Sequence, residues 1–390
     1  MDGRSVRRHP AGGPRRPARA VDLAGSPRRL GGERPGRRGQ RGPLAGALAA
    51  ASGEVAGEVA GEVAETPGPR PGAREPDGWV LADDGAALAA WVHEPARPPQ
   101  PRWRDRVRGR TPAPPTVVLV HGWTLAAVVW DRVLGELVQR RPDVRVVRYD
   151  QRGHGSSAAR GPLSPLGPRG GSVASIRRLG DDLASVVDTC APEGPLVLVG
   201  HSMGGMALLS ASARAPGLLD ARTRGLLLVS TSAGGLSAAG RPLAPLMSAL
   251  ARLPQDLLVP RAPRLLAQRA NYGPGVDPRL VGDTMRAMGR VSGRTTGEWF
   301  AALMAHDESA VLPHLAASGV PVSVLVGDHD RLTPPAHARA LAEAVPQARL
   351  RVVGGTGHMM IVERPDAVAD AVSALLEQPT GERRAQVAAP

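Results

Sequence analysis

The chain has 390 residues, 42% of them hydrophobic, and a formal net charge of +13 that is concentrated at one end. Residues 1–41 hold twelve arginines and three acidic residues, hence +9, so the remainder carries +4, which is ordinary for a globular domain. All 49 basic side chains are arginine, which excludes a phosphate-binding P-loop lysine and lysine Schiff-base chemistry. Cys190 is the only cysteine, which excludes an intrachain disulfide and a cysteine metal cluster.

Metal, cofactor and membrane signals are missing from the sequence. The ten histidines form no HExxH pair, and no apolar run approaches the roughly 18 residues that a membrane helix requires. We therefore predict no metal site, no cofactor and no transmembrane anchor. A stretch with paired arginines at 36–53 resembles an export signal only weakly, so we expect a cytoplasmic protein.

Residues 1–75 are rich in Arg, Gly, Pro and Ala and contain a tandem GEVA repeat at 53–64. This segment has few large apolar side chains, and burying them would not offset the entropy lost on ordering the chain. We therefore predict a disordered tail. An arginine- and glycine-rich tail could bind nucleic acid, but aromatic residues for base stacking are missing, so no nucleic-acid partner is expected. Residues 379–390 form a second predicted tail.

The predicted folded part begins near residue 78. Two apolar segments flank Asp84-Gly85, a dipeptide typical of tight hairpins, and an arginine- and proline-rich loop follows at 94–114. Six apolar runs without alternation come next, which is typical of strands buried on both faces. They lie at 116–122, 144–150, 195–202, 225–232, 320–330 and 349–358.

Helix-like stretches separate these runs, at 126–140, 174–189, 203–215, 334–345 and 364–377. The alternation predicts an α/β fold, with a mostly parallel central sheet flanked by helices on both faces. Residues 233–318 show no clear strand and are too long for a loop, so we predict an inserted helical cap there. The core then consists of 76–232 and 319–378.

Reactive side chains follow three of the predicted strands. In open parallel sheets the functional residues gather at the carboxyl ends of the strands. Ser202 follows one strand within a Gly-x-Ser-x-Gly motif and precedes a helix, where a sharp turn would expose its hydroxyl. Asp328 and Asp330 follow a later strand, and His358 follows the last. This order of serine, carboxylate and histidine fits nucleophilic catalysis.

Over residues 78–378 the chain resembles the α/β-hydrolase superfamily in the motifs VLVHGW, YDQRGHGSS, VLVGHSMGG, VGDHDRLTP and GTGHMMIVERP. The resemblance implies the α/β-hydrolase fold, with Ser202 as the nucleophile, His358 as the base and Asp330 as the acid. It also implies that the backbone N–H groups of Trp123 and Met203 form the oxyanion hole. Asp328 is the alternative acid, and the motif spacing favours Asp330.

Other polar residues have predicted roles of lesser weight. We expect His121 and His154 to support loops, Asp181 and Asp182 to lie on a solvated helix face, and His306 with Asp307 to lie on the surface. The substrate-pocket candidates are His121, Thr124, His201, Tyr272, Trp299 and Met359.

The sequence therefore predicts a serine hydrolase of the carboxylesterase or lipase type, which transfers the acyl group of a small or lipophilic ester to water. Thioesterase, carbon–carbon bond hydrolase, iminopeptidase and cofactor-free perhydrolase are alternatives on the same residues. Haloalkane dehalogenase and epoxide hydrolase are disfavoured, because their relatives carry aspartate where this chain has Ser202. A non-catalytic ligand-binding protein of the same fold is the alternative of another class. The sequence does not indicate an oligomeric state.

Overall fold

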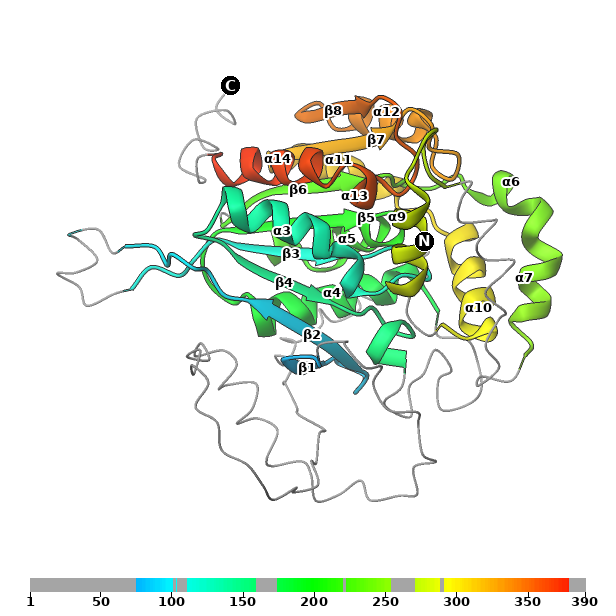
Figure 1. Ribbon diagram of the computed structural model, residues 1–390, viewed down its shortest axis with the longest axis horizontal. Coiled ribbons are helices and arrows are strands. Elements are labelled where there is room, and N and C mark those ends of the chain that lie inside the picture. The colour runs from blue at the N-terminus through cyan, green and yellow to red at the C-terminus, as the bar shows by residue number, and fades with distance from the viewer. Residues whose placement is uncertain are drawn as a thin grey trace, which may run out of the picture.

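The computed structural model describes residues 75–100, 103, 111–158, 174–219, 222–253, 271–287 and 291–378. Both predicted tails lie outside these ranges apart from Glu75, as does most of the basic segment at 101–110. Within them the chain forms one eight-stranded sheet with helices on both faces (Figure 1). None of the helices in the described ranges is both long enough and apolar enough to cross a membrane.

The sheet confirms the predicted mostly parallel arrangement. Its order is β1-β2-β4-β3-β5-β6-β7-β8, in which β1 and β2 form an antiparallel hairpin and β3 to β8 pair in parallel. The strands are β1 (Gly78–Leu81), β2 (Ala87–His93), β3 (Thr116–Val120), β4 (Arg145–Tyr149), β5 (Leu196–His201), β6 (Thr223–Val229), β7 (Val322–Gly327) and β8 (Ala348–Val353).

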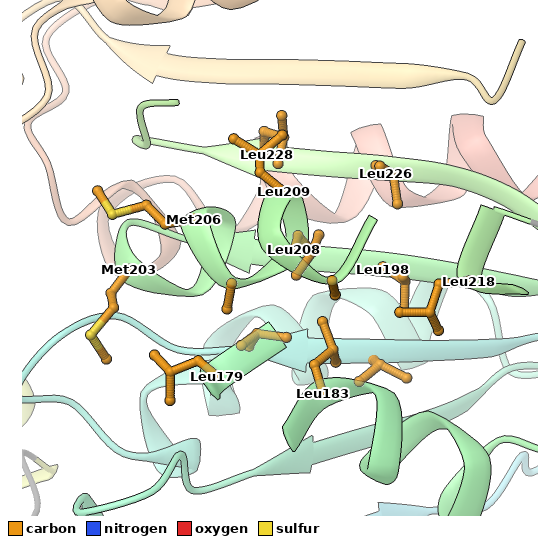
Figure 2. Packing of buried hydrophobic residues seen from close by; sticks show 14 of the residues in the cluster. Leu179, Leu183, Leu198, Met203, Met206, Leu208, Leu209, Leu218, Leu226 and Leu228 are labelled. Carbon is orange, nitrogen blue, oxygen red and sulfur yellow. The ribbon is translucent and has the colours of Figure 1, made fainter. Parts of the chain in front are cut away.

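Alternate residues of the central strands enter two separate hydrophobic cores, which explains why these strands read as continuous apolar runs. One core packs α4 (Ile176–Cys190), α5 (Met203–Arg214) and α12 (Pro335–Ala344) on one face of the sheet (Figure 2). The other packs α3 (Asp131–Arg140) and α14 (Pro365–Leu376) on the opposite face. Val118 and Val120 belong to the first core, and Val117 and Leu119 to the second.

The last strand does not fit the prediction that every parallel strand is buried on both faces. β8 lies at the edge of the sheet, and the side chains of Arg349, Arg351 and Val352 are exposed. An edge strand has a neighbour on one side only, and charged side chains there discourage pairing with another chain.

Between β6 and β7 the regular elements of the described residues are helices, and α6, α7 and α10 lie together at one end of the sheet (Figure 1). The elements are α6 (Ser237–Gly240), η4 (Arg241–Leu243), α7 (Ala244–Leu250), α9 (Pro278–Ala287), α10 (Gly293–Met304), η5 (Ser309–Val311) and α11 (Leu312–Ala317). Gly297 lets α10 approach α7 closely, because a Cβ there would lie 2.3 Å from the Met247 carbonyl oxygen. The segment leaves and re-enters the core at one place, where the Glu308 N–H donates to the Ala233 carbonyl at 2.7 Å.

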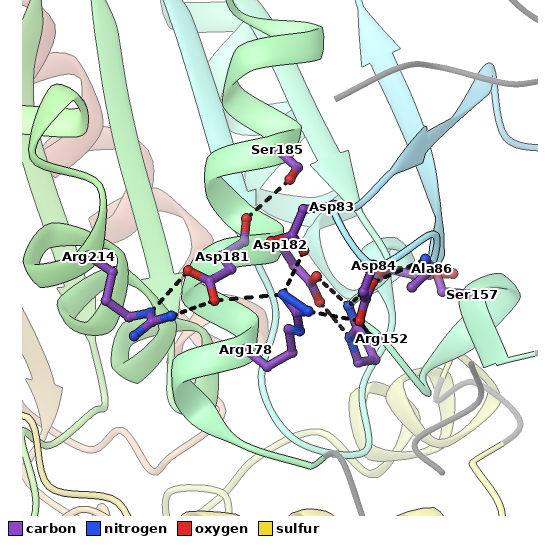
Figure 3. A network of polar contacts seen from close by, with 11 residues as sticks. Asp83, Asp84, Ala86, Arg152, Ser157, Arg178, Asp181, Asp182, Ser185 and Arg214 are labelled. Atoms are coloured by element: carbon purple, nitrogen blue, oxygen red, sulfur yellow. Dashed lines mark hydrogen bonds and ion pairs between the residues drawn. The ribbon is translucent and has the colours of Figure 1, made fainter. Parts of the chain in front are cut away.

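Two predictions about surface position are wrong. Asp182 is fully buried in α4, because the Arg152 guanidinium from the loop after β4 binds its carboxylate (Figure 3). His306 is buried where the helical segment rejoins the core, and its Nε2–H donates to the Ser232 carbonyl at 3.2 Å. Asp307 is exposed as predicted.

Candidate active site

Ser202 occupies a strained turn between β5 and α5, with φ 55° and ψ −119°. Non-glycine residues rarely adopt a positive φ, and such strain concentrates at functional sites. The flanking glycines are required by packing, since a Cβ on Gly200 would lie 2.5 Å from the Gly204 carbonyl oxygen, and one on Gly204 would lie 2.2 Å from that of Val120. The Gly-x-Ser-x-Gly spacing thus permits the sharp turn that presents the serine.

The end of β6 stabilises this turn through hydrogen bonds. The Ser202 N–H donates to the Val229 carbonyl at 2.9 Å, and the Thr231 hydroxyl donates to the Ser202 carbonyl at 2.7 Å. The Ser202 carbonyl also accepts the N–H of Gly205, in the first turn of α5. The strained backbone is therefore fixed by two neighbouring elements.

Asp330 and His358 form a buried pair between the loops that follow β7 and β8. Nδ1 of His358 lies 3.0 Å from each carboxylate oxygen of Asp330. Thr333 donates to the same carboxylate through its N–H at 2.9 Å and its hydroxyl at 3.0 Å. Burial opposes ionisation of Asp330, but the His358 ring and the Thr333 donors outweigh it and lower the pKa of Asp330 to about 2.

Asp328, the alternative acid, lies apart from His358. Its side chain is 41% exposed, and it accepts the Thr356 N–H at 3.2 Å. Asp328 therefore stabilises the loop after β8, and Asp330 is the carboxylate that orients the histidine.

His201 lies beneath His358, fully buried, with the two ring centroids 5.0 Å apart. Its Nε2–H donates to the His358 carbonyl at 2.9 Å, and burial lowers the pKa of His201 to about 3, so the ring is neutral. A Cβ on Gly122 would lie 3.0 Å from Nδ1 of His201 and 3.2 Å from Cβ of Ser202. A glycine at 122 thus lets the ends of β3 and β5 meet beside His358.

The structure brings Ser202 and His358 to the same end of the sheet, and His201, which precedes Ser202 in the chain, packs against His358. Among the described residues the Ser202 hydroxyl makes no hydrogen bond. Hydrogen bonds between catalytic groups are often long without substrate and tighten only in the complex.

The two residues predicted to supply the oxyanion-hole donors lie in segments next to Ser202. Met203 begins α5, so its N–H has no partner within the helix, and Trp123 follows β3 in the adjacent loop. Within the described part of the chain neither N–H has a hydrogen-bond acceptor. Free donors at a helix N-terminus are suited to stabilising a developing negative charge.

A strained serine after β5, a buried Asp–His pair after β7 and β8, and an eight-stranded sheet place the chain among known folds. The family model described as "Alpha/beta hydrolase family" matches residues 117–371. The chain belongs to the alpha/beta hydrolase family.

The relatives of this alpha/beta hydrolase are distant. It is 28% identical to polyketide synthase ThaQ of Burkholderia thailandensis over 281 residues, which cover 68% of the chain but only 12% of ThaQ. It is 25% identical to the sn-1-specific diacylglycerol lipase ABHD11 of Mus musculus, covering 67% of the chain and 81% of ABHD11. A thermophilic esterase structure from Thermogutta terrifontis superposes with a TM-score of 0.58 at 22% identity, covering 76% of the chain and 97% of the esterase.

Four of the six predicted pocket residues of the hydrolase fall into two groups. His121 and Trp299 belong to one series of ring contacts, in which His154 lies 5.4 Å from His121 and 5.9 Å from Trp299 between centroids. Tyr272 and Met359 pack instead into the core on the α3 and α14 face. Thr124, at φ 60°, donates its hydroxyl to the Trp123 carbonyl at 2.7 Å.

Several supporting residues escaped the sequence reasoning. Gln151 lies within the YDQRGHGSS motif and Thr333 within VGDHDRLTP, so the motifs pointed to their neighbourhood but not to their contacts. The backbone carbonyl of Asn271 accepts the His358 N–H at 2.7 Å, and such a main-chain contact has no signal in the sequence. Among the described residues no cluster of three His, Cys, Asp or Glu side chains could hold a metal ion.

Proposed function

We propose that this hydrolase cleaves a carboxylic ester through an acyl-enzyme, with Ser202 as nucleophile, His358 as base and Asp330 as the acid that orients it. The observation that carries the proposal is the buried contact of 3.0 Å between His358 Nδ1 and both carboxylate oxygens of Asp330. That contact directs Nε2 of His358 toward a substrate and fixes one tautomer, which a serine hydroxyl requires for activation.

In the proposed reaction, Nε2 of His358 accepts the Ser202 proton while Oγ attacks the ester carbonyl carbon. The N–H groups of Trp123 and Met203 bind the oxyanion, and losing one such donor typically costs about 10²–10³ in rate. Collapse of the intermediate expels the alcohol, which takes its proton from His358. Water then attacks the acyl-enzyme by the same path and restores Ser202. Asp330 stays ionised throughout, because its pKa is about 2.

The helical segment supports a lipophilic substrate. An apolar hollow of about 380 Å³ lies between α7 and α10, and its lining includes Phe300, whose ring lies 5.9 Å from the Trp123 ring between centroids, but neither Ser202 nor His358. Cavities of roughly 300–1,000 Å³ accommodate small-molecule ligands. Thioesters and carbon–carbon substrates would use the same triad, so substrate assays must separate these chemistries.

The test is hydrolysis of p-nitrophenyl esters from acetyl to palmitoyl by the full chain, compared with Ser202→Ala. We expect Ser202→Ala to lower kcat by on the order of 10⁵-fold or more. The acyl chain length that is hydrolysed fastest would indicate the length of the acyl-binding pocket. Unchanged activity in Ser202→Ala would exclude Ser202 as the nucleophile. If the folded wild type were inactive on every ester but active on thioesters, the substrate class would be thioesters instead of esters.

A further inference from the structure

The loop that carries the proposed oxyanion donor Trp123 is held by the loop after β4. Nε2 of His121 accepts the Gln151 N–H at 2.9 Å, and the Gln151 side-chain amide donates to the His121 carbonyl. The other ring nitrogen of His121 donates to the Gly122 carbonyl at 2.8 Å. Burial lowers the pKa of His121 to about 3, so the ring is neutral and keeps this pattern of one donor and one acceptor. Both the backbone and the ring of His121 are therefore fixed by contacts with Gln151 and Gly122.

The loop after β4 is in turn held by a buried arginine. The Arg152 guanidinium is 1% exposed and donates to Asp182 at 2.9 and 2.6 Å and to Asp84 at 2.8 and 3.1 Å (Figure 3). Asp182 belongs to α4, and Asp84 to the turn of the β1–β2 hairpin. The Arg152 carbonyl also accepts Nδ1–H of His154 at 3.0 Å. Two elements distant in sequence thus fix the residue that follows Gln151.

Stability alone is a weak reason for this arrangement. Desolvation of buried charges often cancels their attraction, and apolar residues of similar volume are frequently as stabilising. A guanidinium does offer a planar fork that fixes its own position when two carboxylates bind it from different directions. An oxyanion donor must be held within about 0.5 Å of its productive position, and this is what a rigid support can supply.

We propose that Arg152 and Gln151 are positioning residues for the oxyanion hole. Asp84 and Asp182 fix Arg152, Arg152 fixes Gln151, and Gln151 fixes His121 and with it the N–H of Trp123. Neither residue touches the substrate. The inference rests on the proposed function, because it assigns a support to the oxyanion hole of that reaction.

The decisive variant is Gln151→Met in the full chain. Methionine has nearly the same volume but cannot donate to the His121 carbonyl. We expect kcat to fall about 10-fold, a fraction of the loss of a whole oxyanion donor, with KM changed less than about twofold. A boronic acid inhibitor, whose adduct with Ser202 is tetrahedral, should lose affinity by the same factor as kcat. A purely structural role would lower the melting temperature without this parallel loss.

Asp84→Asn tests the fork without removing Arg152, whose loss would leave the buried Asp182 carboxylate without its ion-pair partner, whereas Asp84 would still contact Arg178. We expect it to lower kcat about threefold, and the double variant with Gln151→Met to lose less than the product of the single effects, because both act through one loop. Arg214→Gln is the matched control, since Arg214 pairs with Asp181 at the exposed end of the same network and should leave kcat unchanged.

Full kcat and full boronate affinity in Gln151→Met would overturn the positioning role. If Ser202→Ala were inactive in the same experiment, the proposed function would stand while this inference failed. Activity retained in Ser202→Ala would instead remove the proposed function itself.

Discussion

Two carboxylates in this hydrolase are buried beside the carboxyl ends of the strands, and each binds a basic side chain. Asp330 contacts His358, and Asp182 contacts Arg152. Burial and geometry are similar, with contacts of 3.0 Å and 2.6 Å. The partners differ, because an imidazole exchanges its proton near neutral pH and a guanidinium does not.

This difference in the basic partner decides which pair can take part in a reaction and which can only stabilise the fold. The Asp330–His358 pair can move a proton and so can serve a reaction. Arg152 keeps its charge at every working pH, while burial raises the pKa of Asp182, and the pair holds α4 to the loop after β4. A buried ion pair is a candidate for catalysis only when its basic partner can release a proton near neutral pH and lies close to a nucleophile.

The largest expected difference between the pairs is in activity. Asp330→Asn should lower kcat by on the order of 10⁴-fold, because the amide no longer holds His358 in the tautomer that accepts the Ser202 proton. Asp328→Asn is the control and should stay within about twofold of the wild type, since Asp328 does not contact His358. Steady-state ester hydrolysis measures both, and a larger loss in Asp328→Asn would exchange their roles.

The other pair should show its effect in stability. Asp182→Ala leaves the Arg152 charge buried and short of a partner, so the free energy of unfolding should fall by about 3–5 kcal/mol. Asp181→Ala removes a partner of Arg214, whose own side chain is 36% exposed and returns to water, so this change should cost less, about 1 kcal/mol. Urea denaturation of both variants measures the difference. Equal losses would mean that the buried fork contributes no more than the outer pairs.

The pH profile sharpens the comparison further. kcat/KM should rise with pH along a single-proton limb, tenfold per pH unit at its acid end, because one general base must be unprotonated to accept the Ser202 proton. Asp330, with a pKa of about 2, is ionised over this range, while His121 and His201, with pKa values of about 3, are already neutral. Arg152 stays charged throughout. A flat profile between pH 5 and 8 would contradict the role of His358, and a limb steeper than one proton would implicate a second group.

The smallest expected effect concerns the hydroxyl that supports the Asp–His pair. Thr333→Val removes the donor to Oδ2 of Asp330 but keeps the backbone N–H bond, so kcat should fall only about 3- to 10-fold. Thr333→Ser restores the hydroxyl and should restore most of the rate. If the serine variant were as slow as the valine variant, side-chain packing would explain the loss better than the hydrogen bond.

Much of the fold was predictable because its signals are local. The apolar runs and helix-like stretches located the strands and the principal core helices to within a few residues. The positions of Ser202, Asp330 and His358 after strands were predictable, because each lies within a motif that follows an apolar run. The identity of Asp330 as the carboxylate beside His358 rested on motif spacing, and the structure adds the contact itself.

The rest depended on segments that meet only in the folded chain. Asp182 carries two charged neighbours in sequence, Asp181 and Arg178, and nothing local indicates that Arg152 reaches it from another loop. His306 is buried because the returning end of the helical segment packs on the end of β6. β8 alternates arginine with apolar residues, and its position at the edge of the sheet is visible only once the strand order is known.

The sequence by itself determined the alternation of strands and helices and the placing of serine, aspartate and histidine at strand ends, because periodicity, turn chemistry and motif spacing act over a few residues. Only the tertiary structure decided which charges are buried, which nitrogen of His201 and His121 donates, and which loop supports Trp123. Burial and hydrogen-bond partners depend on what other segments bring to a residue, and no local pattern records that.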